Sequence, residues 1–180
     1  MTLTDNGYER DGETPTYGGY STRITVDENY MLRIPKGIPL ERAAPLLCAG
    51  INTYSPLRHF GLKPGNKLAV VGLGGCLGHM GVKFGHALGA HVTVLSHSPG
   101  KRQDALKLGV DDFIATKDED IFMENAGRFD FILGTVSAKH DYNAYLHGAG
   151  RRARGVFAPF CAIPDHEAEN ACRFSDRGHS

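Results

Sequence analysis

Five glycines lie within ten residues in the stretch that runs from Val70 to Gly81, directly after a short apolar run. In such a stretch, Gly72 allows a tight turn and Gly74 lets a phosphate group approach the backbone. A later glycine lets the following helix pack closely on the strand, and the free amides at the helix start face the phosphate charge. The pattern predicts a dinucleotide-binding turn, with a glycine-rich turn without ligand as the alternative. The turn residues are Gly72, Leu73, Gly74, Gly75 and Gly78.

The residues after the next apolar run indicate which dinucleotide would bind. An NAD site usually ends this second strand with an acidic residue that binds the ribose 2′-hydroxyl. Here the run Val92–Leu95 is followed by hydroxyl-bearing and cationic residues, with no carboxylate before position 104. Such groups suit a 2′-phosphate, so we expect NADP rather than NAD. The candidate ligands are Ser96, Ser98, Lys101 and Arg102, and a polar loop with solvated cations is the alternative.

Short apolar runs alternate along the chain with segments of helical periodicity, and these elements must position the candidate residues. Short apolar runs predict buried strands. They lie at residues 68–71, 92–95, 112–115 and 129–133. Helical patterns lie at about 79–89, 100–108 and 138–146. Repeated units of this length predict an α/β fold, a doubly wound parallel sheet with right-handed crossovers.

The two ends of the chain differ from this middle part. Residues 1–16 are polar and predict a loop, whereas residues 17–34 predict two short strands. Residues 147–180 contain five arginines and no lysine, and their apolar residues follow no period. We therefore predict three parts: 1–38, a nucleotide-binding domain over 39–146, and a poorly folded, disordered tail over 147–180, for which an ordered segment is the alternative.

Composition narrows the class of protein. Twenty basic and twenty acidic residues give no net charge, which argues against a non-specific nucleic-acid binder. No apolar run approaches the length that spans a membrane, and residues 1–10 do not resemble a secretory signal. Four cysteines without a CxxC pair favour free thiols in the cytoplasm over a disulfide framework.

Several motifs together resemble the zinc-dependent medium-chain alcohol dehydrogenases, in their cinnamyl alcohol dehydrogenase branch. Besides the glycine turn, they are Thr16–Ser21, Ala44–Gly50, Tyr54–Arg58, Ser96–Arg102 and Thr135–His140. The resemblance covers about residues 7–146. It implies a Rossmann domain preceded by a remnant of a β-rich, GroES-like catalytic domain. It also implies hydride transfer from NADPH to a small aldehyde, or the reverse oxidation of an alcohol, in a protein that is typically homodimeric.

The resemblance assigns further site residues. Cys48 matches the last ligand of the family's catalytic zinc, and Val136 and Ser137 match positions near the nicotinamide. The glycine turn matches the pyrophosphate site, and Ser96, Ser98, Lys101 and Arg102 match the 2′-phosphate pocket. No residue is assigned a catalytic role.

Departures from the family pattern limit these expectations. Family members are about twice as long, so the other zinc ligands are missing and zinc is not expected to be retained by Cys48 alone. The family turn reads Gly-Leu-Gly-Gly-x-Gly-His-Met, and Cys76 is an extra residue in it. The turn either absorbs this residue or moves Gly78 away from its packing position. The resemblance ends abruptly at Leu146, which suggests a reading-frame change and the loss of the last strands. A non-catalytic nucleotide-binding module and an inactive truncated fragment therefore remain alternatives.

Overall fold

The computed structural model describes residues 5–19, 22–117, 120–136 and 140–157. The chain divides into two compact units, Met1–Pro39 and Leu40–Ser180. The larger unit holds the candidate site, and each unit is described by itself. No helix in the described part of the chain has the length and apolar character needed to cross a membrane.

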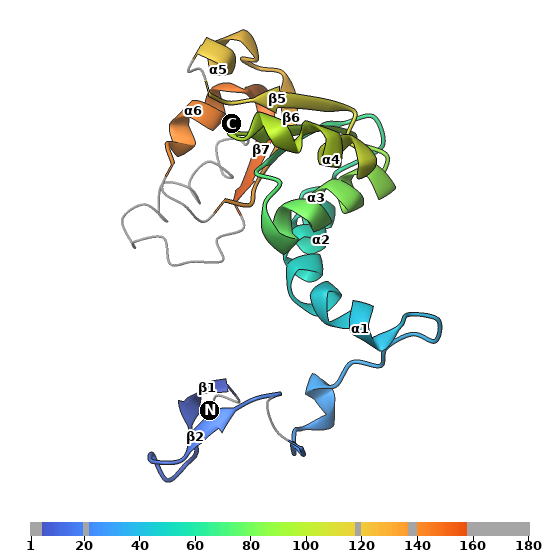
Figure 1. Cartoon of the computed structure of the whole chain (residues 1–180), viewed down its shortest axis with the longest axis vertical. Helices are drawn as coiled ribbons and strands as arrows, with labels where there is room; N and C mark the ends of the chain where they lie inside the picture. Colours follow the sequence, from blue (N-terminus) through green and yellow to red (C-terminus); the bar gives the residue numbers. More distant parts are fainter. Residues whose placement is uncertain (1–4, 20–21, 118–119, 137–139, 158–180) are drawn as a thin grey trace. The chain divides into compact units, whose positions relative to one another are not determined.

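The larger unit is built on a parallel five-stranded sheet (Figure 1). Its strands are β3 (Lys67–Val71), β4 (His91–Ser96), β5 (Asp112–Ala115), β6 (Phe129–Gly134) and β7 (Ala149–Phe157). Their order in the sheet is β5-β4-β3-β6-β7, and all neighbouring strands are parallel. The chain thus winds outward from β3 in both directions, which is the arrangement of a doubly wound Rossmann-like sheet.

Helices cover both faces of this sheet. The principal helices are α2 (Ala49–His59), α3 (Gly75–Ala87), α4 (Arg102–Lys107), α5 (Asp120–Glu124) and α6 (Tyr142–His147). Three short elements are α1 (Leu40–Ala43) and the 3-10 turns η2 (Ala44–Leu47) and η3 (Pro99–Lys101). Side chains of α2, α3 and α4 pack on one face of the sheet, and side chains of α5 and α6 pack on the other.

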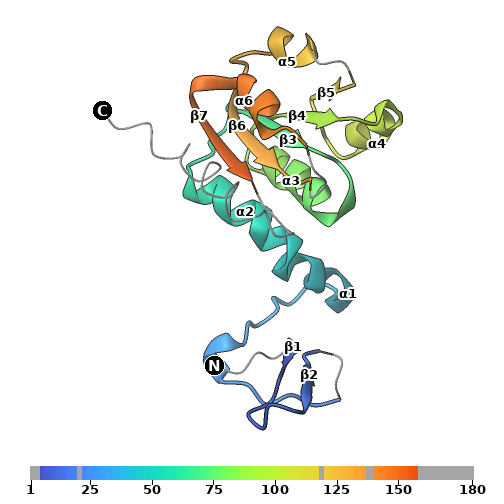
Figure 2. The same ribbon diagram turned by 90° about the vertical axis from the view of Figure 1, so that its left-hand side faces the viewer.

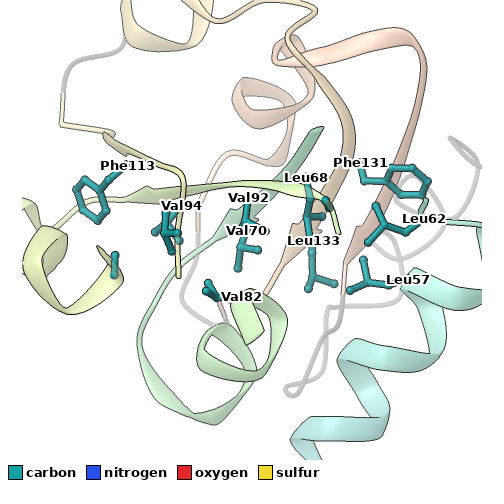
Figure 3. Packing of buried hydrophobic residues seen from close by; sticks show 13 residues of the cluster. Leu57, Leu62, Leu68, Val70, Val82, Val92, Val94, Phe113, Phe131 and Leu133 are labelled. Carbon is teal, nitrogen blue, oxygen red and sulfur yellow. The ribbon is translucent and has the colours of Figure 1, made fainter. Parts of the chain in front are cut away.

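The main core lies between the sheet and α2, α3 and α4 (Figure 3). Val70 and Val92 of the sheet are fully buried beside Val82 of α3. The strands β3, β4 and β6 are buried on both faces, which explains their continuous apolar runs. The four predicted strands and the α/β fold class are confirmed. Helix α3 begins at Gly75, four residues earlier than the periodicity predicted.

The end of the described chain differs from the sequence prediction. Residues 149–157 form β7, which pairs in parallel with β6 through Leu133↔Val156 and Gly134↔Phe157 (Figure 2). The prediction of a poorly folded tail directly after Leu146 is therefore wrong for this segment. Among the described residues, β7 is one of the two edge strands of the sheet, and β5 is the other. An edge strand is paired on one side only, so it does not require the apolar run on which the prediction depended. The prediction for residues 158–180 lies outside the described residues.

The smaller unit also differs from its prediction. The strands β1 (Asp5–Tyr8) and β2 (Pro15–Tyr17) form an antiparallel pair in the stretch predicted as a loop. The described part of residues 17–34 beyond Tyr17 contains no strand, only the 3-10 turn η1 (Glu28–Tyr30). Ile24, Met31 and Leu32 are more than half exposed, so their alternation does not reflect one buried face.

The connection between β1 and β2 is held by one carboxylate. Asp11 accepts hydrogen bonds from the backbone amides of Glu13 and Thr14 and from the Thr14 hydroxyl. The Thr14 side chain and then the two backbone amides lower the pKa of Asp11 from 3.8 to about 2. This local turn brings the two polar strands together without an apolar pattern, which explains why the sequence did not predict them.

Candidate functional site

The candidate site lies at the carboxyl edge of the sheet, around the end of β3. Val71, the last residue of β3, is paired with Leu95 of β4 and with Gly134 of β6. The chain leaves β3 toward β4 on one side, while β6 lies on the other. Ligands of open α/β sheets bind at such a switch point, outside the carboxyl ends of the strands.

The turn after β3 is tied to both neighbouring strands. The Gly72 amide donates to the Leu95 carbonyl at 2.8 Å. On the other side, the Thr135 amide and hydroxyl both donate to the Val71 carbonyl, at 3.0 and 2.8 Å. The Thr135 hydroxyl also lies 3.0 Å from the Gly72 carbonyl oxygen. Thr135 begins one of the motifs that resemble the family but was not among the predicted site residues, although a hydroxyl-bearing residue directly after a buried strand is a signal for such a contact.

Two turn positions exclude any side chain. Gly72 has a φ of +87°, and a Cβ atom there would lie 2.4 Å from Cγ2 of Val136. A Cβ atom at Gly78 would lie 2.3 Å from the Gly72 carbonyl oxygen. Gly78 therefore lets the first turn of α3 pack directly on the backbone of the turn that follows β3, the kind of close approach expected of the later glycine.

The extra residue Cys76 lies in the first turn of α3 and leaves the packing of Gly78 intact. Gly75 has a φ of +70°, a conformation that favours glycine, at the point where α3 begins. Gly78 still packs on Gly72, so the alternative in which the insertion displaces Gly78 does not describe this chain. Cys76 itself is an exposed free cysteine.

The outer side of the turn is open and bears one cation. Gly74 precedes α3 and provides no side-chain hydrogen bond to its first amides. Among the described residues, no atom lies within 4 Å of a Cβ built on Gly75. The atom nearest a Cβ built on Gly74 is Nζ of Lys101, at 3.4 Å. Backbone amides at the helix start and one ammonium group thus face the same space, a combination that suits an anion.

The segment after β4 supplies hydroxyls and cations beside this turn. Ser96 is buried, and its hydroxyl oxygen accepts a hydrogen bond from the Ser98 amide at 3.2 Å. The Ser96 hydroxyl hydrogen can therefore be donated to another group. Lys101 ends η3 and Arg102 begins α4, and both are exposed. These residues lie at the same edge as the glycine turn because β3 and β4 are adjacent and parallel.

The remaining predicted site residues are more scattered. Val136 is partly buried and lies against Gly72. Ser137 lies outside the described residues. Cys48 is an exposed free cysteine at the start of α2. In the described part of the chain, no group of three or more His, Cys, Asp or Glu residues is placed to hold a metal ion, so this donor set does not fit a catalytic zinc.

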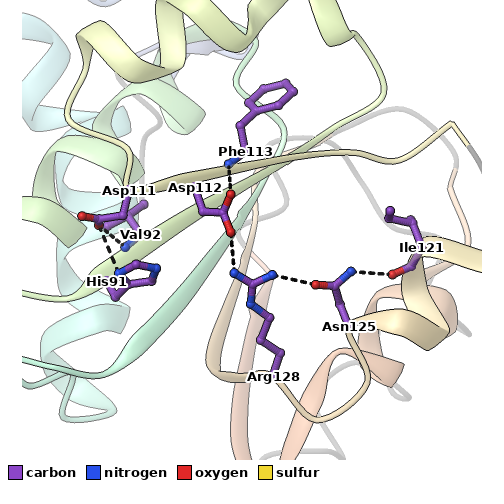
Figure 4. Close-up of polar contacts among 8 residues, drawn as sticks. All are labelled: His91, Val92, Asp111, Asp112, Phe113, Ile121, Asn125 and Arg128. Carbon is purple, nitrogen blue, oxygen red and sulfur yellow. Dashed lines mark hydrogen bonds and ion pairs between the residues drawn. The ribbon is translucent and has the colours of Figure 1, made fainter.

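The amino edge of the sheet carries a different polar network (Figure 4). Arg128 donates to Asp112 at the start of β5 and to the Asn125 side-chain oxygen, the latter at 2.8 Å. Asn125 in turn donates to the Ile121 carbonyl of α5 at 2.8 Å. Burial raises the pKa of Asp112, but the hydrogen bonds from Arg128 and from the Phe113 amide outweigh it, so the pKa lies below 3.8. These contacts join β5, α5 and the start of β6.

The fold and the glycine turn place this unit in the class of dinucleotide-binding α/β domains. The sequence comparison then defines the family. Residues 76–175, more than half of the chain, match the family described as zinc-binding dehydrogenase. The chain belongs to this family. The match continues past Leu146, where the resemblance was expected to end.

Known relatives agree with this assignment. The chain is 60% identical over 146 residues to NADP-dependent alcohol dehydrogenase C 1 of Mycolicibacterium smegmatis, covering 81% of this chain and 41% of that protein. Cinnamyl alcohol dehydrogenase SbCAD4 from Sorghum bicolor has a similar structure, with a TM-score of 0.77 and 38% identity over 95% of this chain and 50% of its own. CAD from Helicobacter pylori, complexed with NADP(H), gives a TM-score of 0.72 at 36% identity, over 92% and 53% of the two chains. The chain thus spans about half or less of the length of these relatives.

Proposed function

We propose that this chain is the coenzyme-binding part of an NADP(H)-dependent, zinc-type alcohol dehydrogenase, which transfers hydride from NADPH to a small aldehyde or, in the reverse reaction, from an alcohol to NADP. The observation that carries the proposal is the open glycine turn at the switch point of the sheet, with Lys101 beside it. The names of the relatives support the reaction class, because they are NADP-dependent alcohol dehydrogenases and cinnamyl alcohol dehydrogenases.

The residues of the turn fit a dinucleotide. A Cβ added at Gly74 would meet only the end of the flexible Lys101 side chain. The space beside the Gly74 backbone is therefore open to a ligand phosphate. The amides that open α3 would hold the pyrophosphate of NADP, and Gly72 and Gly78 keep this backbone in place. When bound, the nicotinamide supplies the hydride for the reaction.

NADP is favoured over NAD by the segment after β4. The Ser96 and Ser98 hydroxyls and the cations of Lys101 and Arg102 are the groups that a 2′-phosphate requires. The segment holds no carboxylate for a ribose 2′-hydroxyl. Val136 and Ser137 follow β6, the neighbour of β3 on the other side, and are proposed to border the nicotinamide half of the ligand.

A second candidate is a nucleotide-binding module without catalysis. The observation that favours it is the donor set around Cys48, which does not fit zinc in the described part of the chain. Oxidation of NADPH that depends on an added aldehyde would support the first function. NADPH binding without such oxidation would support the second.

Two further expectations belong to this proposal. Cys48 and Cys76 are free thiols, which fits a reducing compartment such as the cytoplasm. The family resemblance implies a homodimer, which the molar mass of the purified chain in solution would test.

The binding proposal is tested by placing a methyl group where the phosphate would approach. Gly74 has a φ of −72°, so Gly74→Ala introduces no backbone strain, and we expect folding to be unchanged. NADPH binding should weaken about tenfold, or about 1.4 kcal/mol. Gly19→Ala is the matched control, since a Cβ at Gly19 meets no described atom within 4 Å and lies in the other unit. Equal NADPH dissociation constants for the two variants, measured by calorimetry, would contradict the proposed site.

A further inference from the structure

Thr135, the first residue after β6, holds a carbonyl oxygen of the glycine turn. It is buried, and its hydroxyl oxygen lies 2.8 Å from the Val71 carbonyl oxygen and 3.0 Å from the Gly72 carbonyl oxygen. A hydroxyl has one hydrogen to donate, and the Val71 oxygen also accepts a hydrogen bond from the Thr135 amide at 3.0 Å. Among the described residues, the Gly72 oxygen has no donor except this hydroxyl. The Gly72 carbonyl therefore depends on the Thr135 side chain for its hydrogen bond.

The same carbonyl oxygen is in contact with α3. It lies 2.3 Å from the position that a Cβ of Gly78 would take, and Gly78 is a buried residue of that helix. Gly72 is also packed from the β6 side, where Cγ2 of Val136 lies 2.4 Å from the position of a Gly72 Cβ. The Gly72 carbonyl thus lies between α3 and the end of β6, so its position and that of the first turn of α3 are linked.

The first turn of α3 is also the part of the site that would hold the pyrophosphate in the proposed function, on which this step rests. Its amides bind an anion only while they keep their place, because hydrogen bonds weaken as the distance and angle depart from their preferred values. Without the Thr135 hydroxyl, the Gly72 carbonyl would lack a donor, which is unfavourable. A carbonyl next to a glycine can turn toward water at little steric cost, and this movement would displace the first turn of α3.

We infer that Thr135 is a positioning residue for the coenzyme. Its hydroxyl acts through Gly72 rather than on the dinucleotide: it holds the Gly72 carbonyl against Gly78 and so keeps the amides that open α3 in place. NADPH and NADH share the pyrophosphate, so Thr135 strengthens the binding of both by the same factor. A residue 63 positions beyond Gly72, on the strand that pairs with the other side of β3, thereby sets the geometry of the glycine turn.

The test compares the dissociation constants of NADPH and NADH, measured by calorimetry, for the unchanged full chain and its variants. Thr135→Val keeps the shape of the side chain and removes the hydroxyl, so both dinucleotides should bind about tenfold more weakly at an unchanged ratio, the effect of one hydrogen bond. Thr135→Ser keeps the hydroxyl and should restore most of the affinity for both. If Thr135→Val does not fold, Thr135→Ala, which places no methyl group beside the Gly72 oxygen, replaces it in the same comparison.

Thr53→Val is the matched control, because Thr53 is also buried and its hydroxyl also bonds to backbone carbonyls. Its hydroxyl oxygen lies 2.8 Å from the Ala49 oxygen and 3.0 Å from the Gly50 oxygen, all within α2. Removal of either hydroxyl can lower the free energy of unfolding, which urea denaturation measures. Only the change at Thr135 should lower the affinity for the dinucleotides, and this difference separates a positioning role from a merely structural one.

The outcomes separate this inference from the proposed function. If the unchanged chain binds NADPH and the variant without the Thr135 hydroxyl binds it as tightly, the inference is wrong although the function stands. The inference also fails if Thr135→Ser loses as much affinity as Thr135→Val, or if Thr53→Val loses as much. A folded, unchanged chain that binds neither dinucleotide would overturn the proposed function and the inference with it.

Discussion

The two edges of the parallel sheet are built in opposite ways. At the amino edge, the carboxylates of Asp111, Asp112 and Asp130 accept hydrogen bonds from the chain itself, including the Val92 amide at 2.7 Å and the Lys67 amide at 2.9 Å. At the carboxyl edge, the turn from Gly72 to Gly78 presents backbone groups in place of carboxylates, and its outer side is open to a ligand. Polar groups satisfied within the protein stabilise the fold, whereas an open set of donors is available to a ligand.

Because of this contrast, we expect substitutions at the two edges to change different quantities. Changes at the amino edge should alter the free energy of unfolding and leave dinucleotide affinity unchanged. Changes on the open side of the glycine turn should do the reverse. The inner side of the same turn, where Gly78 of α3 packs on the backbone of Gly72 and Leu73, should behave like the core.

The largest effect is expected at Gly78, on the inner side of the turn. Gly78→Ala would place a Cβ 2.3 Å from a backbone oxygen and 3.0 Å from the Leu73 Cα, so α3 must move. The free energy of unfolding should fall by about 3 kcal/mol, as for overpacking in a core. Urea denaturation measures this change.

Gly50→Ala in α2 is the matched control for Gly78→Ala. Its Cβ would meet the Leu46 side chain at an ordinary 3.5 Å, so the alanine, in the first turn of α2, should raise the free energy of unfolding by about 0.4–1 kcal/mol through the lower entropy of the unfolded chain. If both alanines changed stability equally, close packing at the turn would not be the cause.

A smaller effect is expected at Arg128 on the amino edge. Arg128→Met keeps an apolar stem of similar length beside Phe129 but removes the hydrogen bonds to Asp112 and Asn125. The pair is about one-third exposed, so the free energy of unfolding should fall by about 1 kcal/mol. NADPH affinity, measured on the folded variant, should remain unchanged. A tenfold loss of affinity would show that the two edges are not independent.

The smallest effect is a pH dependence at Asp112. The folded pKa of this carboxyl is lowered below 3.8, so its contribution to stability is present above that value and disappears as the pH falls through the folded pKa. Asp112→Asn should therefore be less stable than the unchanged chain at pH 6, by about 1 kcal/mol or less. The difference should shrink below about pH 4, where the carboxyl of the unfolded chain begins to take up a proton, and disappear once the pH falls below the lowered pKa of the folded state. Thermal unfolding at both pH values measures it, and a difference that grows on acidification would contradict the assignment.

The parts of the fold that could be predicted from sequence are those with local signals. Residues 68–71 are apolar on both faces because β3 is central in the sheet. The spacing of Gly72 and Gly78 follows from backbone contacts within one turn. β7 could not be predicted, because it is paired on one side and contains arginines and glycines rather than an apolar run.

The candidate site was predictable in its residues but not in their arrangement. The segment from Ser96 to Arg102 has the composition of a 2′-phosphate pocket. That Lys101 lies over Gly74 depends on the pairing of β3 with β4 and on the path of η3, neither of which has a sequence signal at Lys101. Likewise, the start of α3 accommodates the extra residue Cys76 through the positive φ of Gly75.

The proposed NADP site is tested most directly by comparing the affinities of the unchanged, folded chain for NADPH and for NADH at low salt. The open carboxyl edge should bind NADPH at least about tenfold more tightly, because a charge-assisted hydrogen bond to the 2′-phosphate contributes about 1.5–3 kcal/mol before solvent exposure reduces it. Calorimetric titration gives both dissociation constants. Equal affinities for the two dinucleotides, or tighter binding of NADH, would contradict the account.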